Sequence, residues 1–354
     1  MSSPVSMALP SAHQAQATAS RLEDLSDALD VFWTLHAVFV IFFMQAGFAL
    51  VEVGSVTSKS ARDIMLKNVL DASVCLLVWW LVGYGVAGGG GNAFVGADFG
   101  SSLALDGNAL ETARWLLGYT YASSCGTIVS GAIAERTHHV GYIISSIITS
   151  ALVYPAVCHW LWSAEGWLAV RNPRGALLGG AFDFAGSGVV HLTGGVLALS
   201  ACIVVGPRAG RFAALPHGGP HSGGSGRCCR SFAAGRRATA VDFRGQSSSF
   251  IMLGTFFLWF GWLAFNTGSV ESLSGPGSGA SPGATSGARV AAKVATRTML
   301  SGGAGCIAVT TIEYWRSRRW SLPTSCFGIL AGTLDADCAS AFAHAMDGGP
   351  FRST

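Results

Sequence analysis

Long uncharged stretches recur along the chain, separated by short polar segments. A helix that crosses a lipid bilayer needs about 20 predominantly apolar residues. Six stretches reach that length, namely 31–51, 72–97, 115–134, 140–164, 184–207 and 245–270. A seventh, 298–312, is short and is expected to extend upstream past Arg297, and an eighth begins near Trp320 and is interrupted by Asp335 and Asp337. The pattern predicts an all-α polytopic membrane protein with about seven to eight spans.

The composition agrees with a membrane protein. Of the 354 residues, 50% are hydrophobic and 12% are charged, whereas soluble domains carry roughly 25% charged residues. The formal net charge of +3 is small, and the basic residues fall between the apolar stretches, so no nucleic-acid partner is expected. The nine cysteines form no CxxC pair and no zinc-like spacing with histidine, so we expect neither a metal nor another cofactor. The first thirty residues lack an apolar signal-peptide core, and insertion is expected to begin with the first helix.

Basic residues are concentrated in the segments 51–72, 207–245 and 316–319. The positive-inside rule places these segments in the cytoplasm and the acidic residues 1–30 outside the cell. We therefore predict an extracellular N-terminal segment at 1–30, a transmembrane domain at 31–315 and an incomplete eighth span with a divergent tail at 316–354. The Gly/Ser-rich basic loop at 208–248 and the segment 271–289 have linker composition. Contact of the basic loop with membrane lipid is an alternative to a simple role in orientation.

Two ionisable residues lie at or near membrane depth in the segment AFDFAGSGVVHLTGG, residues 181–195. Asp183 precedes a span, where a carboxylate caps free N–H groups at the positive end of a helix. His191 follows eight residues later, which in a continuous helix places it about 12 Å deeper. Ionisable groups inside a membrane are costly and often functional. The structural alternatives are a simple cap for Asp183 and, for His191, a buried side chain bonded to a neighbouring helix.

Six strings occur in a recognisable order and spacing. They are MQAGFALVEVGSV followed by SKSARDIMLKNVLDA, SGAIAERT, YPAVCHWLWSAEGW, DFAGSGVVHL, GPRAGRF and GTFFLWFGWLAFNTGS. Together they resemble the ammonium transporter family over roughly residues 31–315. The FAGSGVVH and AERT strings favour this family over the related Rhesus-type gas channels, which remain an alternative.

The resemblance implies a pore through each subunit of a homotrimer in the plasma membrane. Ammonium would be recruited by Trp162, Tyr121 and Ser269, with Asp183 in support, and Tyr121 and Phe265 would form an apolar gate. The family usually has Phe where Tyr121 stands. A cation over an aromatic face gains about 0.5–2 kcal/mol, which suits recruitment, whereas lipid contact or core packing is the structural alternative for each aromatic residue.

His191 matches the first of two histidines along the family's pore. Carrying bare NH4+ across hydrocarbon costs many kcal/mol of solvation. Removing the proton and passing neutral NH3 avoids that cost, and an imidazole relay suits the proton. The resemblance thus implies a transporter rather than an enzyme, for which the spans show no facing carboxylates, Ser/His arrangement or metal-ligand spacing.

The C-terminal part departs from the family pattern. The family has eleven spans, and its second pore histidine lies in the tenth, whereas the surroundings of His344 do not match that position. We therefore expect the chain to represent an incomplete transporter, open to lipid on one side, that folds poorly or does not transport alone. A regulatory, ammonium-sensing or non-transporting subunit is the alternative.

Overall fold

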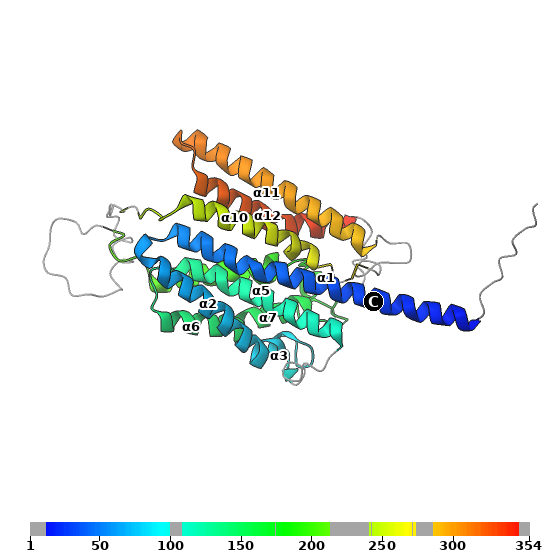
Figure 1. The fold of residues 1–354 in the computed structure, drawn as a ribbon. Helices are drawn as coiled ribbons and strands as arrows, with labels where there is room; N and C mark the ends of the chain where they lie inside the picture. The colour runs from blue at the N-terminus through cyan, green and yellow to red at the C-terminus, as the bar shows by residue number, and fades with distance from the viewer. Residues whose placement is uncertain are drawn as a thin grey trace, which may run out of the picture.

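The computed structural model describes residues 12–99, 108–173, 175–212, 241, 243–270, 272–273 and 286–346, and these form a bundle of helices (Figure 1). Within them there is no strand, only two isolated bridges. The helices are α1 (Ala12–Ser55), η1 (Ser58–Ser60), α2 (Ala61–Val78), η2 (Trp79–Gly83), α3 (Tyr84–Ala87), α5 (Ala109–Ile133), α6 (His139–Ile148), η3 (Thr149–Val153), α7 (Tyr154–Trp162), η4 (Leu177–Gly179), η5 (Ser187–Leu192), α8 (Thr193–Val205), α10 (Ser248–Gly268), α11 (Gly287–Ser317) and α12 (Leu322–Met346).

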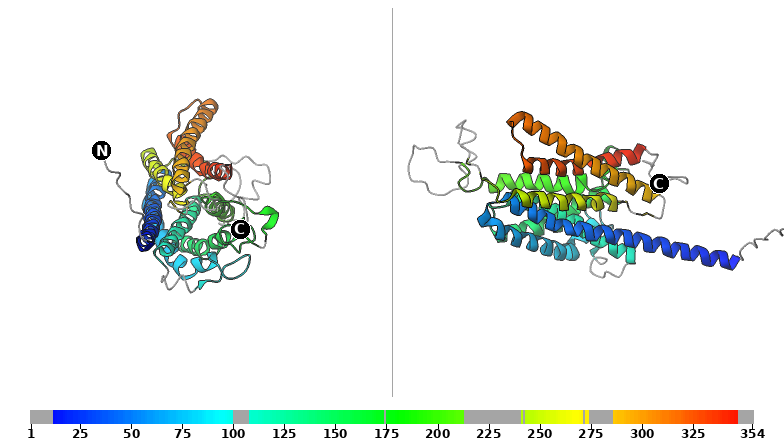
Figure 2. Two further views of the ribbon diagram at one scale, coloured as in Figure 1. Left: turned by 90° about the vertical axis from the view of Figure 1, so that its right-hand side faces the viewer. Right: turned by 45° about the horizontal axis from the view of Figure 1, so that its top comes forward.

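The long helices run side by side. The helix α1 packs along α10, α5 lies between α1, α2 and α8, and α11 and α12 form a hairpin against α10. An end-on view places this hairpin at one side of the bundle (Figure 2). Five stretches of the described chain are long and apolar enough to cross a membrane, namely Ala12–Ser55, Ser58–Ala87, His139–Trp162, Ser187–Val205 and Ser248–Gly268. The protein is therefore a multi-pass, all-α membrane protein, as predicted.

The helix α5 is not among those five stretches, although we predicted a span there. Its buried side carries the hydroxyl residues Thr120, Ser123, Ser124, Thr127 and Ser130. These groups face other helices instead of lipid, so a helix at the centre of the bundle is more polar than those around it. Its N-terminus is fixed by a capping box between Asn108 and Glu111.

Several boundaries differ from the prediction. The helix α1 begins at Ala12 instead of residue 31 and projects beyond the bundle, because acidic residues end an apolar run without ending a helix (Figure 1). The second span runs from Ala61 to Ala87 instead of 72–97, since the charged residues Lys67 and Asp71 in its first half are buried inside the bundle and Gly88 follows its end.

The last two helices bear on two further predictions. The predicted upstream extension of the seventh segment is confirmed as a helix, because α11 continues from Gly287 through Arg297, although α11 is not among the five stretches above. The eighth span is predicted to be interrupted at Asp335 and Asp337; the apolar stretch found there is Leu322–Leu334, while the helix α12 itself continues to Met346. The basic loop and the segment 271–289 lie largely outside the described residues, as do residues 1–11 and 347–354.

Three segments are wound as π-helix, namely η2, η3 and η5. Pro155 follows η3 and has no N–H to donate, so the regular hydrogen-bond ladder cannot continue through it. η2 and η3 approach closely at Gly83, where an added Cβ would lie 2.5 Å from the carbonyl oxygen of Ser150. These widened turns shape the wall of the site described below.

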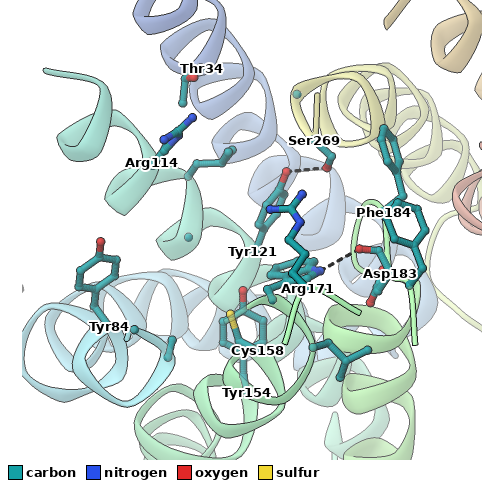
Figure 3. Close-up of a pocket in the computed structure, with 18 of the residues that line it drawn as sticks. Thr34, Tyr84, Arg114, Tyr121, Tyr154, Cys158, Arg171, Asp183, Phe184 and Ser269 are labelled. Carbon is teal, nitrogen blue, oxygen red and sulfur yellow. Dashed lines mark hydrogen bonds between the residues drawn. The ribbon is translucent and has the colours of Figure 1, made fainter. Parts of the chain in front are cut away.

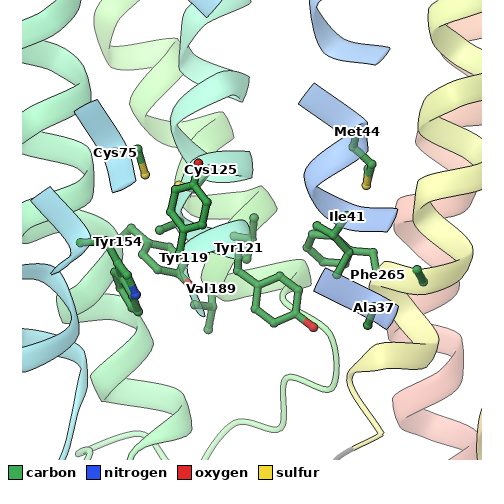
Figure 4. Close-up of a cluster of buried hydrophobic side chains, with 14 of the residues drawn as sticks. Ala37, Ile41, Met44, Cys75, Tyr119, Tyr121, Cys125, Tyr154, Val189 and Phe265 are labelled. Carbon is green, nitrogen blue, oxygen red and sulfur yellow. The ribbon is translucent and has the colours of Figure 1, made fainter. Parts of the chain in front are cut away.

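The buried core joins α1, α5 and α10 (Figure 4). Ile41 and Met44 of α1 face Phe265 of α10, and Tyr121 and Cys125 of α5 lie on the other side. Apolar side chains on the outside of the bundle, such as Leu199 and Ile203 of α8, are exposed, as expected for surfaces that contact acyl chains.

Candidate functional site

A pocket of about 520 Å³ opens at the end of the bundle where α10 ends and α5 begins. Four sequence-predicted site residues line it, namely Tyr121, Trp162, Asp183 and Ser269. They come from α5, α7, the loop before η5 and the C-terminus of α10 (Figure 3). Segments that are far apart in the sequence thus meet at the mouth of one pocket.

Tyr121 lies at the inner end of this pocket. Its hydroxyl is 2.9 Å from Ser269 Oγ, and Ser269 donates its own proton to the carbonyl oxygen of Phe265 at 3.0 Å (Figure 3). A hydroxyl has a single proton, so Tyr121 is the donor to Ser269. The Tyr121 ring centroid lies 4.7 Å from that of Phe265 and 5.9 Å from that of Trp162. Tyr121 is therefore in contact with both the predicted recruitment residues and the predicted gate partner.

Phe265 separates the pocket from His191. It is 0% exposed, and its ring centroid lies 5.2 Å from the His191 ring. Neither Phe265 nor His191 lines the pocket. The paired rings of Tyr121 and Phe265 therefore close its inner end, and the imidazole lies behind them.

His191 is buried and held from two sides. Its Nδ1 is 3.1 Å from the carbonyl oxygen of Gly186, which can only accept, so Nδ1 carries the proton and Nε2 of the neutral ring is an acceptor. Its ring also stacks on that of Trp262, with the ring centroids 5.3 Å apart and an angle of 22° between the ring planes. The helix begins at Ser187 and not at Asp183, so His191 lies on its first turn, about 6 Å along it. The predicted depth of about 12 Å below Asp183 assumed a continuous helix, whereas residues 183–186 are not helical.

Asp183 organises the start of that helix. Its carboxylate accepts hydrogen bonds from the N–H groups of Gly186 at 2.7 Å, Gly188 at 3.0 Å and Val189 at 2.7 Å. Burial raises the pKa of Asp183, and these backbone donors counter the rise. Its carbonyl oxygen also accepts from Trp162 Nε1 at 2.9 Å. One residue thus fixes both the beginning of η5 and the orientation of Trp162.

Gly186 is required by the local backbone. It adopts φ +91°, and an added Cβ would lie 2.7 Å from Val190 Cγ2. A residue with a side chain would therefore strain this turn and displace the acceptor of His191 Nδ1.

Sequence reasoning missed Trp262, although it precedes Phe265 by three residues and shares its helix face. It also missed Arg114 and Arg171, which line the same pocket. His159, within one of the recognised strings, is fully buried, and its ring contacts the carbonyl oxygens of Gly88 at 2.7 Å and Asn92 at 2.8 Å. Its position therefore holds the loop after α3.

Comparison with known proteins decides the family. The sequence profile described as Ammonium Transporter Family matches residues 31–224 and 230–347. The chain belongs to the ammonium transporter family.

Named relatives and solved structures agree with that membership. The chain is 38% identical over 249 residues to Ammonium transporter 1 member 3 of Solanum lycopersicum, covering 70% of this chain and 49% of that protein. It is 35% identical to Ammonium transporter 1 member 1 of Oryza sativa subsp. japonica, and the match covers 90% of this chain and 61% of that protein. It superposes on a Sensor Amt Protein with a TM-score of 0.73 and 28% sequence identity, covering 90% of this chain and 70% of that one. It superposes on Mep2 of Candida albicans with a TM-score of 0.69 and 24% sequence identity, covering 93% of this chain and 66% of that one.

The chain spans about half to three fifths of the length of the curated ammonium transporters that it matches. The pocket, the ring pair and the imidazole all fall inside the matched residues. The members of the family named above are transporters and a sensor, not enzymes.

Proposed function

We propose that the protein transports ammonium, in place of the expectation from the sequence that the chain does not transport alone, because the pocket, the ring pair and His191 are assembled within this chain. NH4+ is recruited in the pocket beside Trp162, Tyr121 and Ser269. At the gate of Tyr121 and Phe265 one N–H bond of the cation breaks and its proton passes to Nε2 of His191, which relays it onward, while neutral NH3 crosses the gate. The observation that carries this proposal is the continuous file of rings from Trp162 through Tyr121 and Phe265 to His191.

The chemistry of these rings supports this order of transport steps. An aromatic face attracts a small cation with about 0.5–2 kcal/mol, and the rings of Trp162 and Tyr121 lie in the pocket wall. Phe265 offers no hydrogen bond and is fully buried, so a hydrated cation cannot continue past it without losing solvation. A neutral molecule meets no such penalty. The unprotonated Nε2 of His191 is the first acceptor among the rings behind this gate.

The test is ammonium-induced current in proteoliposomes that contain the whole chain. We expect a saturable current, and in Trp162→Leu an ammonium concentration at half-maximal current about 2- to 30-fold higher, the range that corresponds to one lost cation–π contact. Trp160→Leu is the matched control, because Trp160 bonds to Phe94 O and does not line the pocket. Equal currents in both variants, or none in the unmodified chain, would contradict the proposal.

A second candidate function is ammonium sensing, favoured by the similarity to the Sensor Amt Protein. A sensor needs the recruitment pocket but no flux. Ammonium-dependent change in tryptophan fluorescence that is lost in Trp162→Leu, together with no current at any ammonium concentration, would support sensing over transport.

We further propose a homotrimer in the plasma membrane, with residues 1–30 outside the cell and the basic loop 208–248 in the cytoplasm. The domain limits of 31–315 and 316–354 belong to the same proposal. No catalytic role is proposed for any residue. The basic ends of α2, α5, α8 and α11 support this orientation, since Lys59, Arg136, Arg208 and Arg316 all belong to turns at one end of the bundle (Figure 1).

A further inference from the structure

A second set of buried ionisable groups lies apart from the pocket and the ring file, between α1, α2, α5 and α6. Glu52 is 8% exposed, Lys67 4% and Asp71 3%. The proposed transport steps use none of them. Charged groups enclosed among membrane helices are costly unless each is compensated, so the charge balance of this set needs an explanation.

Glu52 has the partners of an ionised carboxylate. Its Oε1 accepts from Ser130 Oγ at 2.7 Å and its Oε2 from Asn68 Nδ2 at 2.6 Å. Lys67 interacts electrostatically with the exposed Asp63 and with Glu52, while its Nζ donates to the carbonyl oxygen of Thr137 at 2.8 Å. Lys67 is thus the buried cation whose charge offsets that of Glu52.

Asp71 has different partners. Among the described residues its hydrogen-bond partners are two hydroxyl groups, Ser146 at Oδ1 and Thr127 at Oδ2. Each hydroxyl also faces acceptors of its own. Ser146 Oγ lies 3.3 Å from the carbonyl oxygen of Tyr142, and Thr127 Oγ1 lies 3.0 Å from Gln45 Oε1.

Around Thr127 the acceptors outnumber the donors. Thr127 has one hydroxyl proton and three acceptors around it, namely Asp71 Oδ2 at 3.1 Å, Gln45 Oε1 at 3.0 Å and Ser123 O at 2.9 Å. Gln45 Nε2 donates to Ser123 Oγ at 3.0 Å, which fixes its Oε1 as an acceptor. Of the three groups around Thr127, only Asp71 is able to carry an extra proton and donate it.

A further polar atom points to a ligand here. Asn68 is 6% exposed, and its Oδ1 lacks a hydrogen-bond partner in the described part of the chain. Tyr142, which is 2% exposed, forms a hydrogen bond with Ser130 and interacts electrostatically with both Asp71 and Glu52. The cluster thus holds two carboxylates, one cation and an unsatisfied polar atom, which leaves one negative charge to neutralise.

We propose that Asp71 binds a proton, so that Glu52, Lys67 and Asp71 form a proton-binding cluster in which Lys67 neutralises Glu52 and the bound proton neutralises Asp71. A protonated Asp71 donates to Ser146 or Thr127 and leaves both hydroxyls free to reach their own acceptors. Other ionisable groups that face Asp71 are Cys75 on α2, Tyr119 and Cys125 on α5 and Tyr142 on α6. Thiol and phenol groups are mostly neutral at pH 7 in their ordinary form, so they do not change the balance. At alkaline pH the carboxyl group gives its proton to hydroxide, forming water and a second buried negative charge.

The contrast with Asp183 supports the assignment. The Asp183 carboxylate accepts from three backbone N–H groups, which only donate, whereas Asp71 meets hydroxyls that have other acceptors. Proton binding at Asp71 does not depend on ammonium transport, because this cluster lies apart from the ring file and needs no substrate.

The test is infrared spectroscopy of the purified whole chain in lipid nanodiscs. We expect the band of a protonated carboxyl group at neutral pH, lost on alkaline titration and absent in Asp71→Asn. In Lys67→Met the cation is gone, so Glu52 must also take a proton and the band should grow about twofold. Lys59→Met is the matched control, because Lys59 is exposed, and it should leave the band unchanged.

The opposite outcomes are equally clear. No band in the unmodified chain would overturn the proposal, as would a band that persists in Asp71→Asn. A band that appears only when choline replaces Na+ would assign the cluster to a metal cation instead. If Asp71→Asn fails to fold, Lys67→Met still decides. A protonated Asp71 predicts a band in the unmodified chain that grows about twofold in Lys67→Met. An ionised Asp71 predicts no band in the unmodified chain and at most one protonated carboxyl group in Lys67→Met.

Discussion

At the scale of single residues, Tyr121 has two separable roles. Its ring contacts Trp162 and Phe265, and its hydroxyl donates to Ser269. Tyr121→Phe keeps the ring and removes the hydroxyl. We expect a loss of about 1 kcal/mol in the free energy of unfolding, typical of one neutral hydrogen bond, with the gate still closed. Thermal unfolding in detergent measures the loss.

The control is a double-mutant cycle with Ser269→Ala. That variant should lose a similar amount, and the double variant should lose little more than either single variant. Fully additive losses would show that the two hydroxyls act independently.

Arg114 gives a second prediction at this scale. It is exposed and lines the pocket (Figure 3), where its charge repels the cation that we propose to bind there. At about 8 Å in water, two unit charges interact by about 0.5 kcal/mol, so Arg114→Gln should lower the ammonium concentration at half-maximal current about twofold.

This gain should shrink as salt is raised, because screening weakens the repulsion. Arg21→Gln, on the exposed beginning of α1, is the control and should have no effect. Currents measured at low and high ionic strength decide, and a salt-independent gain would contradict the electrostatic explanation.

At the scale of elements, α1 and α10 meet through glycines. An added Cβ on Gly254 would lie 2.6 Å from the carbonyl oxygen of Gly47. Gly254→Ala should therefore force the helices apart and cost about 1–3 kcal/mol. Gly303 of α11 has no atom within 4 Å of an added Cβ, so Gly303→Ala should be neutral or stabilise by up to about 1 kcal/mol. Thermal unfolding compares the two, and equal losses would contradict this account.

The turn between α5 and α6 carries a pH-dependent contact. Glu135 adopts φ +59°, accepts from the N–H and hydroxyl of Thr57 and forms an ion pair with Arg208 at 2.8 Å. Burial alone would raise the pKa of Glu135, but these partners outweigh burial and hold it below its ordinary value. The stabilisation is therefore present above the ordinary pKa and is lost as the pH falls through the lowered pKa.

We expect Glu135→Gln to lower the melting temperature at neutral pH and to match the unmodified chain once the pH is well below the ordinary carboxyl pKa. Glu165→Gln, an exposed carboxylate, is the control. A melting difference that stays constant across this range would mean that the charge of Glu135 is not what stabilises the turn.

Elements and site differ in how far the sequence determines them. The apolar runs predicted the order of the five stretches that are long enough to span a membrane, since hydrocarbon imposes a minimum helix length. They could not place the start of α1 or the end of α12, because charge ends an apolar run but not a helix. They gave no sign of the π-helical turns, which depend on contacts such as that of Gly83 with Ser150.

The family resemblance singled out Tyr121, Trp162, Asp183 and Ser269, which line one pocket, and Phe265 and His191, whose rings follow Tyr121 outside it. The carboxylate cluster was not foreseen. Glu52 and Asp71 are nineteen residues apart on different helices. Nothing in the linear sequence shows that they belong to one buried cluster with a single lysine.

At the scale of the whole molecule, charge is distributed unevenly between the two ends of the bundle. Gln246 and Ser247 donate backbone hydrogen bonds to Val56 and Gly54, so the beginning of α10 is tied to the end of α1. Glu135 and Arg208 join the turns after α5 and α8 at the same end. The basic turns therefore form one surface, and the acidic beginning of α1 lies at the opposite end (Figure 1).

Moving this basic surface across a bilayer is unfavourable, which sets the orientation that we predict. An epitope fused to the N-terminus should bind antibody on intact expressing cells, and an epitope inserted within the basic loop 208–248 should bind only after permeabilisation. The second insertion is its own control for expression, because both tags must be seen once the membrane is opened. The reverse pattern would place the pocket of Tyr121 and Trp162 in the cytoplasm, and the pocket would then serve efflux or internal sensing instead of uptake.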